Sequence, residues 1–345
     1  MILLKKLSVP SERVFRRKPY NQKNSDEYLF KREFVKKLPH VFPILRKNSY
    51  IPPCGRLFNG ISFNLLQFNT IIGINGLLKS YLKSFFFLTK IRKITRLDNI
   101  LYITNSNSHN FFHWFLDVLQ KVEFINQRSD KILNSKLRIV IPNGHENRFS
   151  KKSLKAFNLN FYYQKKNEII VSKQSILLPD IAPTGNFRKK LVLKLSARMR
   201  EHWKNKKKIS PSKKRIYISR NNSNKRKLIN EKDILPILKN YGFIILDFDQ
   251  INFEKQIDYI LNSEIIVSTH GAALTHMLWM KKGGRILEIR AKNNSFDNCY
   301  FSLASDLGHE YFYVLADKTN IKESNHFSDL TINIKNFSSE LVKMI

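Results

Sequence analysis

The sequence predicts an α/β protein with two Rossmann-like domains, the second of which is a doubly wound parallel sheet. Three features support this prediction. After residue 214, short apolar strands alternate regularly with helices of about ten residues, which is typical of βαβ units. A less regular alternation of the same kind runs from Ile100 to Asn205. Between the two lies a stretch rich in lysine, serine and proline, residues 206–214, which indicates a linker.

The chain has 345 residues, and single hydrophobic cores rarely grow beyond about 250 to 300 residues. We therefore predict an N-terminal domain of residues 1–208 and a C-terminal domain of residues 209–345. Residues 1 to about 50 are basic and show no sustained periodicity, so we expect an irregular leader that wraps the first domain. Four prolines interrupt this leader: Pro10, Pro19, Pro39 and Pro43.

The elements are placed from the spacing of the apolar residues. Runs of four to five apolar residues are expected to form buried strands, and longer amphipathic segments are expected to form helices. The first domain is predicted to contain strands 100–103, 137–141 and 175–178 and helices 108–124 and 188–205. The second is predicted to contain strands 215–219, 243–246, 264–268, 285–289 and 311–314 and helices 231–240, 253–262, 272–280 and 299–307.

The charge of the chain is strongly positive, with 61 Lys and Arg against 27 Asp and Glu. Such an excess attracts nucleic acid, anionic lipid or nucleotide-linked substrates. The lysines are scattered over every segment, however, so we expect most of the excess to be a solvated surface. Two cysteines, Cys54 and Cys299, are too few for a disulfide framework, which favours a reducing compartment.

Export and membrane insertion are not expected. The first six residues, 1–6, lack the apolar core of about 7 to 15 residues that a signal peptide needs. The most apolar stretch, 71–88, is interrupted by Lys79 and Lys83 and is shorter than the roughly 20 apolar residues that span a bilayer. Residues 82–88 either form part of a buried helix or lie on an anionic membrane surface.

In the second domain, candidate ligand-binding residues follow the predicted strands. His270, Gly271 and Ala272 form a turn between a strand and a helix, where free backbone N–H groups suit a phosphate. Gly271 lets the backbone approach a pyrophosphate, and Arg220 and Arg226 offer charge-assisted contacts to its oxygens. Alternatively, Gly271 permits tight packing of the strand against the helix, and the arginines are surface charge.

Two carboxylate motifs lie on the same side of the predicted sheet. Glu288, at the end of the fourth strand, faces either a ligand or one of its neighbours, Arg285 and Arg290. Asp247 and Asp249 form a D-x-D triplet, which in other proteins holds Mn²⁺ or Mg²⁺ against a diphosphate. The arginine pair and the helix terminus stabilise a leaving phosphate without a metal, so we expect none.

In the first domain, His113 and Asp117 are four residues apart and share one face of the predicted helix. The carboxylate can hold one imidazole nitrogen while the other faces a substrate, which is the arrangement of a general base. The alternative is a core histidine within an apolar helix. Trp114 either packs on a sugar face or lies in the core. His109, four residues before His113, raises the possibility of a metal site, but a loop or helix cap is the alternative.

Three segments in this order resemble glycosyltransferase family 61, over roughly residues 99–315. The sequence departs from the usual pattern of the family at Ala273, where glycine is common, and at His276, where asparagine is common. These departures concern the preference for a particular sugar nucleotide more than the fold. The matching segments are a histidine-tryptophan box followed by aspartate (His113, Trp114, Asp117), an arginine-rich strand end followed by an asparagine-glutamate helix start (Ile218, Ser219, Arg220, Arg226, Asn230, Glu231), and a His-Gly-Ala turn (His270, Gly271, Ala272).

The resemblance implies a GT-B type enzyme, with two Rossmann-like domains facing a cleft, that transfers a sugar with inversion at the anomeric carbon. A nucleotide sugar would dock on the second domain through Arg220, Arg226, His270, Gly271 and Ala272, with Glu288 on the ribose hydroxyls, and His113 with Asp117 would activate the acceptor.

A bacterial capsular polysaccharide type is expected, in which the enzyme is cytoplasmic and peripheral at the inner membrane face. Its acceptor would be a glycan or a lipid-linked intermediate of surface polysaccharide or lipopolysaccharide. The alternative is a non-enzymatic, basic nucleic-acid-binding protein, although the sequence shows no helix-turn-helix, zinc ligands or platform of interleaved basic and aromatic residues.

Overall fold

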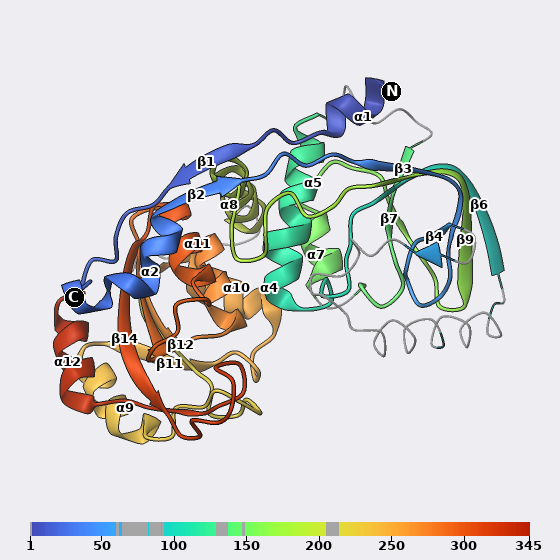
Figure 1. The fold of residues 1–345 in the computed structure, drawn as a ribbon. Coiled ribbons are helices and arrows are strands. Elements are labelled where there is room, and N and C mark those ends of the chain that lie inside the picture. Colours follow the sequence, from blue (N-terminus) through green and yellow to red (C-terminus); the bar gives the residue numbers. More distant parts are fainter. Residues whose placement is uncertain are drawn as a thin grey trace. The chain divides into compact units, whose positions relative to one another are not determined.

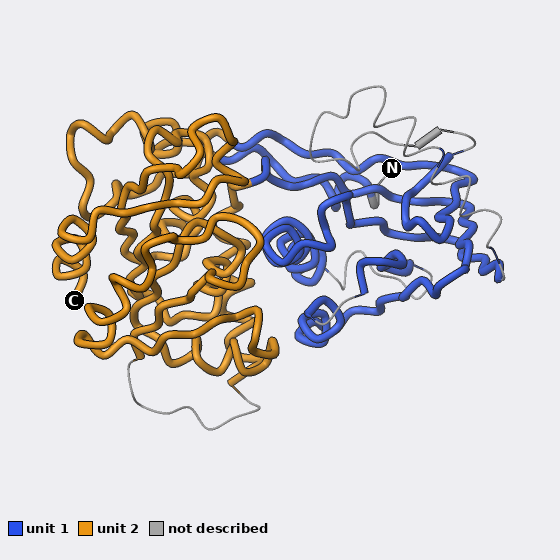
Figure 2. The backbone as a smooth tube through the Cα atoms, turned by 90° about the horizontal axis from the view of Figure 1, so that it is seen from below, with its two compact units in different colours: residues 1–12, 38–184 blue, residues 13–37, 185–345 orange. Residues whose placement is uncertain are grey.

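The computed structural model describes residues 2–59, 62–63, 82, 91, 93–128, 137–146, 149–204 and 214–345. The chain divides into two compact units, each with its own large sheet (Figure 2). Unit 1 consists of residues 1–12 and 38–184, and unit 2 consists of residues 13–37 and 185–345. Of the stretch in which we placed the linker, 206–214, residues 206–213 lie outside the described residues, as does the apolar stretch 71–88 apart from Leu82.

The sheet of unit 1 is mixed. Its described strands lie in the order β5-β4-β3-β9-β6-β7-β8. The last four are parallel, and their order corresponds to the first half of a Rossmann sheet, whereas β3, β4 and β5 are antiparallel additions that the sequence did not indicate. The bounds are β3 Ile44–Ile51, β4 Phe58–Asn59, β5 Ser62–Phe63, β6 Lys93–Tyr102, β7 Leu137–Ile141, β8 Phe161–Tyr163 and β9 Glu168–Leu177.

A long helical segment follows β6 and carries many of the buried apolar side chains of unit 1. It begins as α4 (Phe111–His113), continues through a π-helical turn, η3 (Trp114–Val118), and ends as α5 (Leu119–Asn126) (Figure 1). A second helix, α7 (Ser150–Leu154), connects β7 to β8. Asn110 caps the first helix, because its side chain accepts a hydrogen bond from the Phe112 N–H. Single-turn π segments are found frequently at functional sites.

The sheet of unit 2 has the strand order β11-β10-β12-β13-β14-β15. All neighbours are parallel except the short edge strand β15. The order of the five parallel strands is that of a doubly wound sheet, whose direction of winding reverses between β10 and β12. The bounds are β10 Lys214–Ser219, β11 Phe243–Asp247, β12 Ser263–Thr269, β13 Arg285–Ala291, β14 Glu310–Lys318 and β15 Leu330–Thr331.

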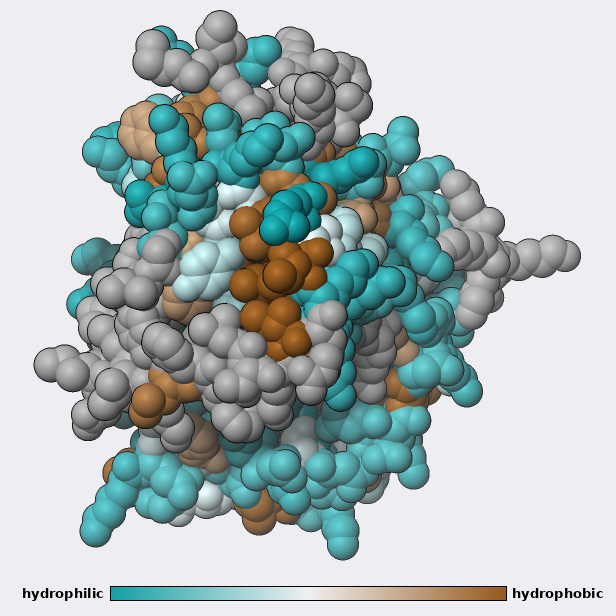
Figure 3. Space-filling view, turned by 90° about the vertical axis from the view of Figure 1, so that its right-hand side faces the viewer, coloured by the Kyte–Doolittle hydropathy of each residue, from teal (hydrophilic) through white to brown (hydrophobic). Residues whose placement is uncertain are grey.

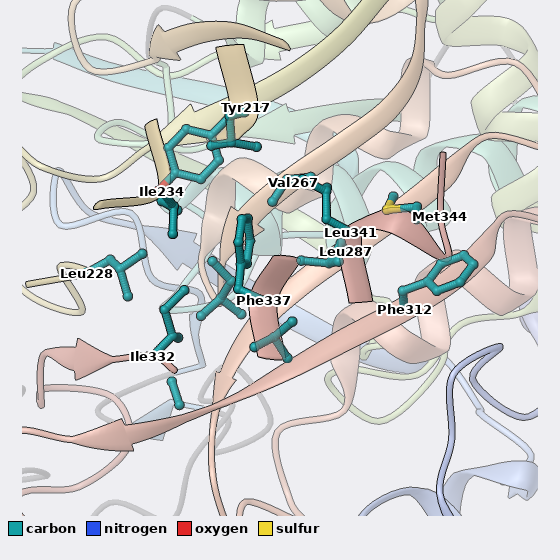
Figure 4. Close-up of a cluster of buried hydrophobic side chains, with 14 of the residues drawn as sticks. Tyr217, Leu228, Ile234, Val267, Leu287, Phe312, Ile332, Phe337, Leu341 and Met344 are labelled. Carbon is teal, nitrogen blue, oxygen red and sulfur yellow. The ribbon is translucent and has the colours of Figure 1, made fainter. Parts of the chain in front are cut away.

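Helices cover both faces of this sheet, as the predicted doubly wound arrangement requires. On one face, α9 (Glu231–Asn240) and α12 (Ile334–Val342) pack on a cluster of buried side chains that includes Tyr217, Val267 and Leu287 (Figure 4). Each fully buried side chain of this size contributes about 1.5 to 3 kcal/mol. The other helices, which pack against one another, are α8 (Lys189–Lys204), α10 (Phe253–Leu261), η4 (Ala272–Trp279) and α11 (Cys299–Leu307).

The N-terminal segment differs from the irregular leader that we expected. Residues 2–51 contain two helices, α1 (Ile2–Leu7) and α2 (Glu27–Phe34), and three strands, β1 (Glu12–Phe15), β2 (Val35–Leu38) and β3. The four prolines lie between these short elements, so they mark turns in a regular structure.

Part of this N-terminal segment belongs to unit 2, where a buried ion pair holds it. The Arg16 side chain is 0% exposed and donates to Asp306 at 2.9 Å and to Glu33 at 3.3 Å. Asn186 accepts a further hydrogen bond from the same guanidinium at 3.0 Å. Within the part of the chain that the structure describes, no helix is both long and apolar enough to cross a bilayer.

Candidate functional site

The carboxyl edge of the unit 2 sheet brings the predicted binding residues together. Strand β10 ends at Ser219 and leads into Arg220, while the neighbouring β12 ends at Thr269 and leads into His270 and Gly271. The helix after β10 lies on one face of the sheet and the helix after β12 on the other. In open α/β sheets, ligands bind at this reversal point, beyond the carboxyl ends of the strands.

Gly271 makes room for the guanidinium of Arg220. A Cβ atom at position 271 would lie 2.5 Å from Arg220 Nη1 and 3.0 Å from Cζ. The φ angle of Gly271 is 172°, an extended conformation that any residue adopts, so the requirement for glycine is one of space. The sequence led us to expect that this glycine admits a pyrophosphate, but in the structure the arginine lies against it.

Arg220 and Arg226 lie close together and repel each other. Burial, followed by the charge of Arg226, lowers the pKa of Arg220. The Nε atoms of both arginines are buried without a hydrogen-bond partner, and in the described part of the chain neither guanidinium forms an ion pair. Arg226 also has a φ of 58°, in the left-handed region that a non-glycine residue rarely adopts. Clustered cations, unused donors and a strained backbone together indicate an anion site.

The backbone at the start of η4 adds donors to this site. The first hydrogen bond of the helix is donated by the Leu274 N–H to the Gly271 carbonyl at 2.9 Å. The N–H groups of Ala272 and Ala273 precede that bond, and the first N–H groups of a helix have no acceptor within it. The segment is a 3₁₀ helix rather than the α-helix that we predicted.

His270 forms a buried pair with Glu288. The distance from His270 Nδ1 to Glu288 Oε1 is 2.5 Å, and the Tyr311 hydroxyl donates to the other carboxylate oxygen at 2.6 Å. Burial alone would raise the pKa of Glu288, but His270, Arg290 and Tyr311 outweigh it and hold that pKa below its ordinary value. Both oxygens of Glu288 are thus engaged within the protein. The structure places Glu288 beside His270, and its contact with ribose hydroxyls stays a prediction.

The D-x-D triplet has polar neighbours of its own. Asp247 accepts hydrogen bonds from Asn222 at 2.5 Å and from the backbone N–H of Asp249 at 2.9 Å. Asp249 accepts one from Ser223 at 3.2 Å. Among the residues that the structure describes, no three or more His, Cys, Asp and Glu side chains form a metal-binding group. Activity without a metal stays a prediction.

In unit 1, His113 and Asp117 form the predicted pair. His113 Nδ1 lies 2.7 Å from Asp117 Oδ2 across one turn of the helical segment. The His113 side chain is 19% exposed and that of Asp117 is 3% exposed, so the imidazole reaches the surface while the carboxylate lies behind it. Burial raises the pKa of Asp117, and the hydrogen bond from His113 opposes that effect. The pair can therefore accept a proton at the exposed side of the imidazole.

The next residue on the same helix face, Lys121, was not among the predicted site residues. Its buried ammonium group donates to Asp180 at 2.8 Å, and Asn105 donates to the same carboxylate at 2.9 Å. Asn105 follows β6 and Asp180 follows β9, two neighbouring parallel strands, so this network lies at the carboxyl edge of the unit 1 sheet. The spacing of positions 113, 117 and 121 was the signal in the sequence that points to Lys121.

Two of the alternatives for this helix are settled by the structure. Trp114 is fully buried and its indole N–H donates to Ser153 Oγ at 2.9 Å, so it belongs to the core and our suggestion that it packs on a sugar was wrong. His109 is exposed in the loop before the helix, where its Nδ1 lies 3.0 Å from the Ser106 carbonyl oxygen. The loop alternative for His109 is thus confirmed.

Unit 1 also carries an apolar depression of about 370 Å³. Its lining residues come from strands β3 and β9. In the view of Figure 3, a group of hydrophobic side chains is surrounded by hydrophilic ones. None of the predicted site residues lines the depression. The lining residues are Asn48, Ser49, Tyr50, Ile169, Val171, Ser172 and Lys173.

Comparison with known proteins identifies the family of the chain. A family model described as Glycosyltransferase 61 matches residues 111–287, just over half of the chain and a range that holds His113, Arg220 and His270. The chain therefore belongs to glycosyltransferase family 61, and it is a glycosyltransferase. Since this is a family of enzymes, the alternative of a non-enzymatic nucleic-acid-binding protein is set aside.

Two curated relatives have the same description, EGF domain-specific O-linked N-acetylglucosamine transferase. The chain is 28% identical to the Gallus gallus protein over 102 residues and 31% identical to the Drosophila melanogaster protein over 98 residues. Each match covers 28% of this chain, and 19% and 18% of the respective relative. The matched segment thus spans less than a fifth of the length of these relatives.

Proposed function

We propose that the protein is an inverting glycosyltransferase that uses a nucleoside diphosphate sugar as donor. The observation that carries this proposal is the pair of Arg220, which lies beside the Gly271 turn at the reversal point of the sheet, and Arg226, both of which have a buried Nε without a hydrogen-bond partner. A diphosphate supplies a negatively charged partner with which these guanidinium groups can form ion pairs. His270 and the first N–H groups of η4 add further donors, so the leaving diphosphate is stabilised without a metal ion.

The acceptor hydroxyl would be activated in unit 1. His113 takes the hydroxyl proton on Nε2 while the acceptor oxygen attacks the anomeric carbon from the side opposite the leaving group, which inverts the configuration. Asp117 holds Nδ1 and stabilises the imidazolium that forms. Unit 2 would hold the donor, a division of roles that corresponds to a GT-B type enzyme. That arrangement stays a prediction.

The acceptor is proposed from the charge of the chain. A formal charge of +34 favours association with anionic lipid, so we retain a glycan or lipid-linked acceptor of bacterial surface polysaccharide or lipopolysaccharide synthesis, at the inner face of the membrane. The relatives are described as N-acetylglucosamine transferases acting on EGF domains, and UDP-N-acetylglucosamine is accordingly the first donor to test.

The test is a thermal stabilisation screen over UDP-, GDP- and CMP-sugars. A donor that binds only the folded protein at 100 times its Kd stabilises the fold by about 2.7 kcal/mol, which raises Tm measurably. Arg220→Ala should lose that shift and keep the Tm of the free protein. If no nucleotide sugar raises Tm, while the protein retains nucleic acid at about 150 mM salt, the proposed function is wrong.

A further inference from the structure

The imidazole of His270 contacts a buried carboxylate and the ring of Tyr300. On one side, Glu288 is 0% exposed and contacts Nδ1. On the other side, the Tyr300 ring packs edge-on against the imidazole, with ring centroids 4.9 Å apart, and Tyr300 is close enough to Arg220 and Arg226 for their charges to act on it. The imidazole therefore connects the interior of the sheet to the proposed diphosphate site.

The carboxylate of Glu288 is held in place by several groups. Tyr311 donates to Oε2, and the Tyr311 hydroxyl in turn lies 3.4 Å from Arg290 Nη1. Arg290 is fully buried, donates to the Asn294 carbonyl at 2.6 Å, and lies over the Phe30 ring at 4.9 Å. An ionised carboxylate held in this way only accepts hydrogen bonds. Nδ1 of His270 must therefore carry the proton, which leaves Nε2 for a ligand.

We propose that Glu288 is a positioning residue that fixes His270 with its proton on Nδ1, and that diphosphate binding draws a second proton onto Nε2. This inference rests on the proposed function. The proton comes from solvent and binds the Nε2 lone pair, the new N–H donates to a phosphate oxygen, and no covalent bond of the ligand changes.

The charges around His270 explain why His270 takes up a proton when the ligand binds. A bound diphosphate brings negative charge to the two guanidinium groups, and Glu288 stabilises the imidazolium from behind. The titratable and charged groups that face the pair come from five segments of unit 2: Arg220 and Arg226 from the loop after β10, Glu288 and Arg290 from β13, Cys299 and Tyr300 from α11, Tyr311 from β14, and, farther from His270, Asp247 and Asp249 after β11.

The first experiment measures the tautomer directly. The ¹⁵N shifts of the histidine side chains are recorded for the free protein, and the His270 signals are assigned by their loss in His270→Asn. We expect the free imidazole to carry its proton on Nδ1. A proton on Nε2 in the free protein would overturn the inference, whatever the variants of Glu288 do.

The second experiment is titration calorimetry with UDP or GDP, whichever the stabilisation screen selects. At about pH 7, the measurement is repeated in two buffers of different ionisation enthalpy, which gives the number of protons taken up. We expect an uptake of up to one proton, and a Kd that rises by as much as tenfold per pH unit where the site titrates. Glu288→Gln removes the anion behind the imidazole and should abolish most of that uptake.

Glu264→Gln is the matched control, since Glu264 lies on the same sheet, near the opposite end of β12, and pairs with Arg215 and Arg285. It should bind the nucleotide with unchanged proton uptake. Nucleotide binding with no proton uptake in the unmodified protein would overturn the inference and leave the proposed function standing, whereas absence of nucleotide binding would count against the proposed function itself. If Glu288→Gln does not fold, the tautomer measurement and the loss of uptake in His270→Asn still decide the question.

Discussion

Replacement of Gly271 by alanine tests the arrangement of the anion site. The added methyl group would lie 2.5 Å from Arg220 Nη1, which is closer than a methyl carbon approaches a nitrogen to which it is not bonded, so the guanidinium must move away. The backbone at 271 is extended and the displaced group is the end of a flexible side chain, so the fold should be preserved. A lost charge-assisted contact costs about 1.5 to 3 kcal/mol, which corresponds to a Kd that is about 10 to 150 times higher.

The assay is titration calorimetry with the nucleoside diphosphate, together with thermal denaturation of the free protein. Gly242→Ala is the matched control, because Gly242 has a φ of 73° and an added Cβ would meet no atom within 4 Å. That variant should lose about 1 kcal/mol of stability through backbone strain while its nucleotide affinity stays normal. If Gly271→Ala binds the nucleotide as tightly as the unmodified protein, Arg220 does not contact the donor.

The remaining predictions concern the base, the metal and the pH dependence of stability. His113→Ala should lower turnover by about 10² or more with nearly unchanged Tm and donor affinity, whereas a large drop in Tm with no selective loss of turnover would indicate a core histidine. Asp117→Asn removes the anion that stabilises the imidazolium, so the acidic limb of the pH profile of kcat/KM should move to lower pH. If that limb does not move, Asp117 does not influence the catalytic base. Turnover should persist in excess EDTA, and a loss that Mn²⁺ restores would contradict the metal-free mechanism. Burial lowers the pKa of His276 to about 3 and of His309 to about 4, from 6.5 in each case. Below about pH 6.5 the unfolded chain binds protons that the folded protein does not. The free energy of unfolding should therefore decrease as the pH is lowered, by up to about 1.4 kcal/mol per pH unit for each histidine. Denaturant unfolding between pH 7.5 and 5 measures this, and a constant value would refute it.

The parallel sheet of unit 2 was predictable because its signals are local. Its strands are short apolar runs buried on both faces, and the helices between them have clear starts and ends. The helices 231–240 and 299–307 have the bounds that the spacing predicted, and each predicted strand lies within an observed one. The last helix, α12, was not predicted, although Phe337 and Leu341 are part of the core.

The N-terminal segment was not predictable, because long-range contacts hold it. Arg16 looks like one basic residue among many, and its buried partner, Asp306, is 290 positions further along the chain. No local pattern connects the two residues. The antiparallel strands of unit 1 are a similar case, since β3 pairs with β9 across more than a hundred residues.

The candidate site was predictable in its residues and less so in its geometry. Spacing alone brought out the pair of His113 and Asp117, and the order of strands and turns brought out Arg220 and His270. The need for a glycine at position 271 depends on the position of the Arg220 guanidinium. One partner of Glu288 is Tyr311, a side chain from a neighbouring strand. Such details follow from packing distances that a linear sequence does not contain.

The buried pair of Arg16 and Asp306 also affects how the protein is made. Arg16 leaves the ribosome 290 residues before its partner, and at about 5 to 20 residues per second that interval lasts roughly 15 to 60 s. Unit 2 therefore completes its core only after α11 has been synthesised. A fragment that starts at residue 185 would contain the whole sheet of unit 2 but would lack Arg16, the cation that pairs with Asp306 in the buried ion pair.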